Sequence, residues 1–82
     1  MAVNKAKALA AAQKHLSRNN IDRAIKELTR IVKDDAKDLR TRQKLAELLA
    51  RQGSIDAAMK EFSIVAEAYE RGGFYPKAAA IY

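Results

Sequence analysis

The sequence predicts an all-α protein built from a repeated helical hairpin. The first observation is a stretch at residues 20–32 that recurs at residues 54–66, with Ile21 of the first copy matched by Ile55 of the second. The second is that apolar residues recur at three- and four-residue spacings through most of the chain, as they do in amphipathic helices. A repeat whose period equals the step along the chain from Ile21 to Ile55 is typical of stacked helical hairpins, because one hairpin cannot bury its apolar face alone.

Residues 4–18 are predicted to form the first helix, because alanines and Leu16 fall on one stripe at helical spacing. Asn19 and Asn20 interrupt this pattern, and Asn20 is suited to cap a second helix, since asparagine favours turns and helix N-caps. The second helix is expected to bury a stripe that comprises Ala24, Ile25, Leu28, Ile31 and Val32.

A polar break at residues 33–38 separates the second helix from the third. Asp35 and Asp38 are expected to cap the start of the third helix, which runs to about Gln52. Gly53 is predicted to end this helix, because glycine readily takes the left-handed conformation found just after a helix C-terminus.

A fourth helix is predicted to begin after Ser54, which has the character of a cap, and to reach about Arg71. Gly72 and the glycine after it end the pattern, and Pro76 suits the first turn of a fifth helix because that position needs no N–H donor. The apolar stripe of the fourth helix comprises Ile55, Ala58, Met59, Phe62, Val65, Ala66 and Tyr69.

We expect one domain over residues 1–82, with a first unit at about 5–37 and a second at about 38–71. For residues 72–82 two interpretations stay open. Either the fourth helix is shared and opens a partial third unit, or an unrelated capping helix follows the second unit.

Equivalent places in the two units hold mostly small, apolar or turn-forming residues. The first unit has Ala11, Ala12, His15, Asn19, Ala24 and Leu28, and the second has Leu45, Ala46, Leu49, Gly53, Ala58 and Phe62. This pattern, at this period, resembles the tetratricopeptide repeat. The resemblance extends from about Ala8 to Tyr82 and implies a short right-handed solenoid of about five helices.

The resemblance also implies a function, because in tetratricopeptide arrays the first helix of each hairpin lines a concave groove that binds a peptide or helix of a partner. The residues expected to line that groove here are Leu9, Gln13, Arg40, Gln43, Lys44 and Glu47. Arg40 and Lys44 lie one helical turn apart and favour an acidic segment. We therefore expect a protein–protein interaction scaffold.

The charge of +6 leaves a second hypothesis open. Residues 1–41 hold ten Lys or Arg and five Asp or Glu, a balance of +5, which is compatible with a basic helical module that binds nucleic acid. A third hypothesis is a structural fragment that self-associates through its C-terminal helix. No apolar run is long enough to predict a membrane span, and the absence of cysteine suits a cytoplasmic location.

Catalytic chemistry is not expected. The single histidine, His15, has no cysteine or second histidine to join it as a metal ligand, and we expect a structural role for its side chain. The acidic run at residues 34–38 lacks the glycine and terminal glutamate of a calcium loop. The sequence therefore predicts no enzyme, no metal site and no cofactor.

Overall fold

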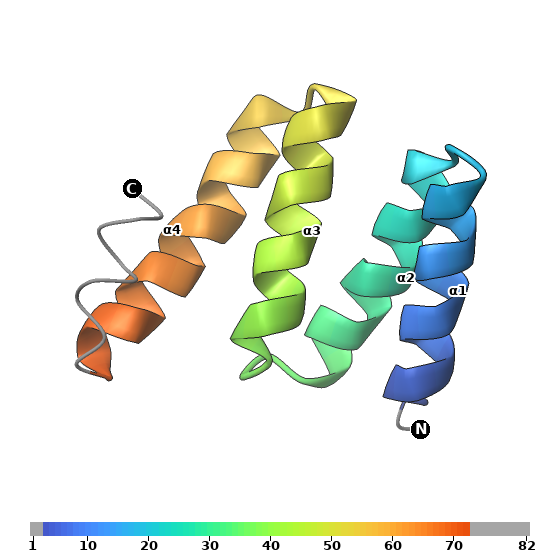
Figure 1. Cartoon of the computed structure of the whole chain (residues 1–82). Helices are drawn as coiled ribbons and strands as arrows, with labels where there is room; N and C mark the ends of the chain where they lie inside the picture. The colour runs from blue at the N-terminus through green and yellow to red at the C-terminus, as the bar shows by residue number, and fades with distance from the viewer. Residues whose placement is uncertain (1–2, 73–82) are drawn as a thin grey trace.

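The computed structural model describes residues 3–72, and these residues form four α-helices and no strand (Figure 1). The helices are α1 (Lys5–Ser17), α2 (Ile21–Asp34), α3 (Leu39–Gln52) and α4 (Ile55–Arg71). The predicted all-α class is confirmed. The predicted fifth helix, and self-association through it, fall on residues outside those that the structure describes.

The period of the sequence repeat is also the period of the helix starts. The step along the chain from Lys5, where α1 begins, to Leu39, where α3 begins, equals the step from the start of α2 at Ile21 to the start of α4 at Ile55. Each helix packs against its neighbours in the chain, α1 on α2, α2 on α3 and α3 on α4 (Figure 1). The described residues therefore form two hairpins placed side by side.

Three of the four helices begin with a side chain that caps the first turn. Asn4, Asn20 and Asp38 each accept a hydrogen bond from the backbone N–H three residues further on, which satisfies a donor that has no partner within the helix. Ser54 stands at the N-cap of α4 as predicted, but it forms no capping bond. Its hydroxyl donates instead to the side-chain oxygen of Gln52, at 3.0 Å.

The turn inside each hairpin has the same geometry. Asn19 and Gly53 occupy equivalent positions and both have a positive φ, 57° and 94°. In each case the next residue's N–H reaches back over the turn, from Asn20 to the carbonyl of His15 at 2.8 Å and from residue 54 to residue 49 at 2.9 Å. These bonds satisfy carbonyls that a helix end leaves open. The prediction that Gly53 ends α3 is confirmed.

The core lies along the line of contact between successive helices. Its buried apolar members are Ala8, Ala12, Ala24, Leu28, Ile31, Val32, Leu45, Ala46, Leu48, Ala58, Val65 and Ala66. Alanine lets helix backbones approach closely, and the larger residues fill the space between them. The apolar stripe predicted for α4 is covered only in part, because Ile55 and Met59 are more than half exposed. The reason is that α4 packs on α3 alone among the described helices.

One nearly buried ion pair joins the two helices of the second hairpin. Nη1 of Arg42 lies 2.9 Å from Oε1 of Glu61, and the two side chains are only 13% and 17% exposed. Glu27 is the equivalent of Glu61 in the first hairpin, but the position equivalent to Arg42 is Ala8. Glu27 therefore pairs within its own helix, with Arg30 at 3.4 Å.

Candidate functional site

The six residues predicted to line a groove surround one hollow of about 720 Å³. The residues around this hollow are Leu9, Ala12, Gln13 and Leu16 of α1, Leu28 of α2, Arg40, Thr41, Gln43, Lys44 and Glu47 of α3, and Tyr69 of α4. We call it the α1–α3 groove, because these two helices supply most of its wall.

The two walls of the α1–α3 groove differ in chemistry. The α1 wall offers mainly apolar atoms, from Leu9, which is 41% exposed, and from Leu16, together with the one amide of Gln13; the buried Leu28 of α2 also lines the hollow. The α3 wall is polar: it offers cationic and amide side chains, among them Arg40 and Gln43, and one anionic side chain, Glu47. A ligand that fits both walls needs apolar atoms along one side and anionic or hydrogen-bonding groups along the other.

This asymmetry follows from the repeat. Leu9 occupies the same place in its unit as Gln43, and both face the groove. The positions equivalent to Arg40 and Lys44 are Ala6 and Ala10, which carry no charge. The positive charge of the groove therefore comes from the second hairpin alone.

The two cations of the α3 wall differ in whether they have an ion-pair partner. Lys44 lies 4.0 Å from Glu47, and both side chains are about half exposed, so water screens this pair strongly. Arg40 is exposed and forms no ion pair or side-chain hydrogen bond with any other residue in the described range 3–72. Arg40 is thus the cation of the groove that is available to an incoming carboxylate.

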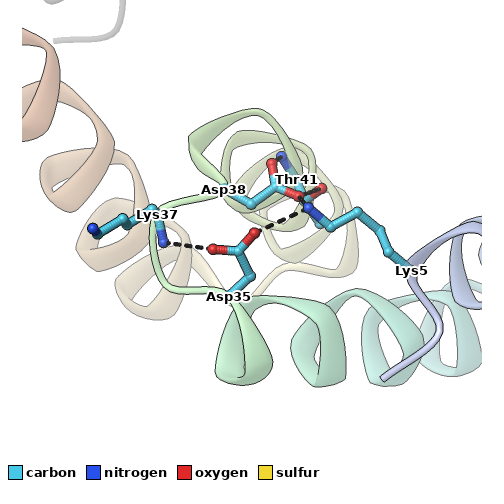
Figure 2. Close-up of polar contacts among 5 residues, drawn as sticks. All are labelled: Lys5, Asp35, Lys37, Asp38 and Thr41. Carbon is cyan, nitrogen blue, oxygen red and sulfur yellow. Dashed lines mark hydrogen bonds and ion pairs between the residues drawn. The ribbon is translucent and has the colours of Figure 1, made fainter. Parts of the chain in front are cut away.

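A polar network lies at the end of the molecule where α1 and α3 begin, and one of its members, Thr41, also lines the groove (Figure 2). Nζ of Lys5 lies 2.8 Å from Oδ2 of Asp38 and 3.1 Å from Oδ2 of Asp35. The hydroxyl of Thr41 donates to Oδ2 of Asp38 at 2.6 Å, and the N–H of Lys37 donates to Oδ1 of Asp35 at 3.2 Å. The network joins the first turn of α1 to the connection between α2 and α3.

The charges in this network shift one another's proton affinity. The hydrogen bonds to Asp38 and Asp35 raise the pKa of Lys5 above its usual value. Burial acts to raise the pKa of Asp38, but the hydrogen bonds from Lys5 and Thr41 outweigh it, so that this pKa lies below its usual value. Both shifts favour the charged forms, so the ion pair is intact at neutral pH.

The sequence did not reveal this network. Asp35 and Asp38 were expected only to cap α3, and Asp38 does so by accepting from the N–H of Thr41 at 3.1 Å. Lys5 was not assigned any role, because its partners belong to the next repeat unit and to the connection before it, far away in the chain. A lysine in the first turn of a helix is unfavourable for the helix dipole, which was the one available sign that it serves another purpose.

A second, smaller hollow of about 490 Å³ lies against α2, α3 and α4. Arg42 and Glu61 belong to its lining, but they neutralise each other across 2.9 Å. Lys33 and Lys60 also line this hollow; both are exposed and form no ion pair among residues 3–72.

The described residues offer no cluster that fits a metal ion, since no group of three or more His, Asp or Glu side chains gathers within residues 3–72. His15 is half-buried on α1. Within the same range, no helix is both long and apolar enough to cross a membrane.

Comparison of the chain with known protein families, with curated proteins and with solved structures finds no match. The geometry of the groove is accordingly the basis on which a function can be proposed.

Proposed function

We propose that this chain is a protein-interaction module, and that the α1–α3 groove binds a peptide or helix of a partner protein that carries acidic side chains. The observation that carries the proposal is the pairing of an apolar α1 wall with an unpaired arginine, Arg40, on the facing α3 wall. The equal spacing of the helix starts in the two hairpins supports a tetratricopeptide-like arrangement, the resemblance from which the groove was predicted.

In this proposal the α1 wall contributes most of the affinity, and the α3 wall attracts and orients the ligand. Covering the exposed part of Leu9, together with Leu16, removes apolar surface from water and supplies most of the affinity. Arg40, with Lys44 one turn further on, attracts carboxylates, speeds the encounter and fixes which edge of the ligand faces α3.

An elongated polypeptide fits this groove better than a compact small molecule does. The walls come from two helices that each pack on α2, and the lining extends from the first turn of α3, at Arg40, to Glu47 two turns later. An amphipathic helix presents apolar residues at intervals of three and four positions, which matches a groove of this form.

A direct test uses synthetic peptides of about 14 residues with leucines one helical turn apart, flanked either by Glu or by Gln. The parent chain is expected to bind the Glu series about tenfold more tightly, and the double variant Arg40→Glu, Lys44→Glu is expected to lose that preference. Fluorescence anisotropy measures the affinities, and circular dichroism checks that helicity is unchanged. Equal affinity of parent and double variant for the Glu series would refute the proposal.

A matched control is available on α2. Arg23→Glu with Lys26→Glu changes the charge by the same amount at two exposed positions outside the groove. These changes are expected to leave peptide binding within about twofold of the parent.

A second candidate function has its own observation. Arg23, Lys26, Arg30 and Lys33 are all exposed, and their spacing places them on one outward face of α2. Such a stripe can follow the phosphates of a nucleic acid, and only Arg30 among its four members forms an ion pair within residues 3–72, with Glu27 at 3.4 Å. The two double variants separate the candidates, because nucleic-acid binding would be lost with Arg23→Glu, Lys26→Glu and would fall steeply with salt.

A further inference from the structure

We propose that Lys5 is a positioning residue for the α1–α3 groove, and that its ion pairs with Asp35 and Asp38 set the width of the groove. The effect on ligand binding rests on the function proposed above for this groove. The effect on the position of α1 does not, and it can be measured in the free protein.

The walls of the groove are not in direct backbone contact. No Cα atom of α1 lies within 8 Å of a Cα atom of α3, whereas α2 packs against both helices. Within residues 3–72 the contacts of Lys5 are the only hydrogen bonds or ion pairs that run from α1 to the α2–α3 connection or to α3. The separation of the walls is therefore set through α2 and through Lys5.

Lys5 lies at a point on α1 where a small movement of the helix would change the width of the groove. It lies one helical turn before Leu9, so both side chains lie on the same side of α1. Its partner Asp38 is the N-cap of α3, and Thr41, which donates to Asp38, is part of the groove lining (Figure 2). The network thus connects the start of one wall to the start of the other.

The opposite end of α3 is held differently. The side chain of Gln52, at the end of α3, donates a hydrogen bond to Asp22, in the first turn of α2. That contact fixes α3 to α2 and leaves the end of α1 without a polar tie to α3. Release of Lys5 is therefore expected to let the start of α1 shift away from α3, within the limits set by the packing of α1 on α2.

The ion pairs of Lys5 are suited to positioning α1 rather than to stabilising the fold. The carboxylate of Asp38 belongs to a side chain that is only 13% exposed, but Lys5 is 44% exposed. Water competes for an ammonium group in such a position, so its loss shifts the population of wall separations without unfolding the hairpins.

The first experiment measures wall separation directly. The chain has no cysteine, so Ala10→Cys on α1 and Ala50→Cys on α3, both at exposed positions, accept one spin label each. Pulsed electron–electron double resonance on the full chain then gives the distance distribution. Lys5→Gln is expected to broaden it and move it to longer distances.

Two companion variants show whether the effect belongs to the ion pairs. Lys5→Arg keeps the charge and is expected to restore the parent distribution. Lys7→Gln removes an exposed charge from the same helix without breaking any ion pair of the described residues, and it is expected to change nothing. A Lys5→Gln distribution that superimposes on the parent distribution would overturn the positioning role, whatever happens to binding.

The second experiment measures affinity for the Glu-flanked leucine peptide described above. Lys5→Gln is expected to weaken binding about two- to fivefold, and Lys5→Arg is expected to bind as the parent does. If Lys5→Gln changes the distances but not the affinity, while Arg40→Glu, Lys44→Glu still abolishes binding, then groove width does not govern binding and this inference fails. If neither the Lys5 variant nor the Arg40 and Lys44 variant affects binding, the groove is not the binding site, and the distances alone decide the role of Lys5.

Discussion

Replacement of Glu61 by glutamine is expected to destabilise the second hairpin far more than an ordinary charge neutralisation. Glu61 balances Arg42 across 2.9 Å, in a place where the two side chains are 17% and 13% exposed. After Glu61→Gln the guanidinium keeps its charge but loses the counter-ion that compensated its desolvation. The Nε atom of Arg42 is buried and already lacks a hydrogen-bond partner in the described part of the chain. After Glu61→Gln the guanidinium group would therefore have an uncompensated charge in addition to an unsatisfied donor.

The size of the effect follows from the degree of burial. Removing one partner of a fully buried pair costs about 3–5 kcal/mol, whereas exposed pairs contribute about 0–1 kcal/mol. Since roughly a sixth of each side chain is exposed and glutamine still offers one acceptor oxygen, we expect a loss of about 2 kcal/mol in the free energy of unfolding. For a chain of this size that corresponds to a fall in Tm of about 8–16 °C.

Urea and thermal unfolding, followed by far-UV circular dichroism, measure this loss. Glu47→Gln is the matched control, because Glu47 is 49% exposed and lies 4.0 Å from its partner, and it should change stability by less than about 0.5 kcal/mol. The apolar pair Arg42→Met with Glu61→Leu should return to within about 1 kcal/mol of the parent. If Glu61→Gln proves as mild as Glu47→Gln, the interpretation of this pair as desolvated and mutually dependent is wrong.

The remaining predictions concern the turns and the polar network. Asn19→Ala and Gly53→Ala should each cost about 1 kcal/mol in unfolding free energy by urea titration, because alanine is strained at a positive φ; the space around Gly53 is open, so a clash with neighbours contributes nothing there. The contribution of Asp38 to stability should be complete above about pH 5 and should fall as the pH drops through its depressed pKa, since its ordinary value is 3.8. Asp38→Asn should therefore flatten this part of the stability profile, and an unaltered acid dependence would count against the network. At the alkaline end, the contribution of Lys5 should be complete below its ordinary value of 10.5 and disappear as the pH rises through its raised pKa.

The features that could be predicted from the sequence are those set by local spacing. Asparagine and aspartate at helix starts, and Gly53 at a helix end, indicate where the chain turns, and the structure confirms the helix boundaries that follow from them. The resemblance to the tetratricopeptide repeat, and not spacing alone, selected Leu9, Gln13 and Arg40, which the structure places around one groove. Their role in binding stays a prediction.

The features that the sequence did not reveal depend on how the helices pack. The pairs Lys5–Asp38 and Arg42–Glu61 join residues of different helices or connections that are far apart in the sequence, and hydrophobic periodicity carries no information about such pairs. Similarly, the apolar spacing that includes Met59 is correct for a helix face, but its exposure depends on the absence of a neighbour on that side among the described helices.

The matching turns at Asn19 and Gly53 make the hairpin an interchangeable unit. A segment that runs from residue 21 to residue 54 begins after one left-handed turn and ends after the next, so both of its junctions have the same backbone geometry. Inserting a further copy of this segment would join helix to helix through a turn the chain already forms, and would add one more wall beside α3. The added helix would carry its own pair of residues at the positions of Arg40 and Lys44. Each inserted copy would therefore add side chains that a longer ligand could contact, without any change in the turns.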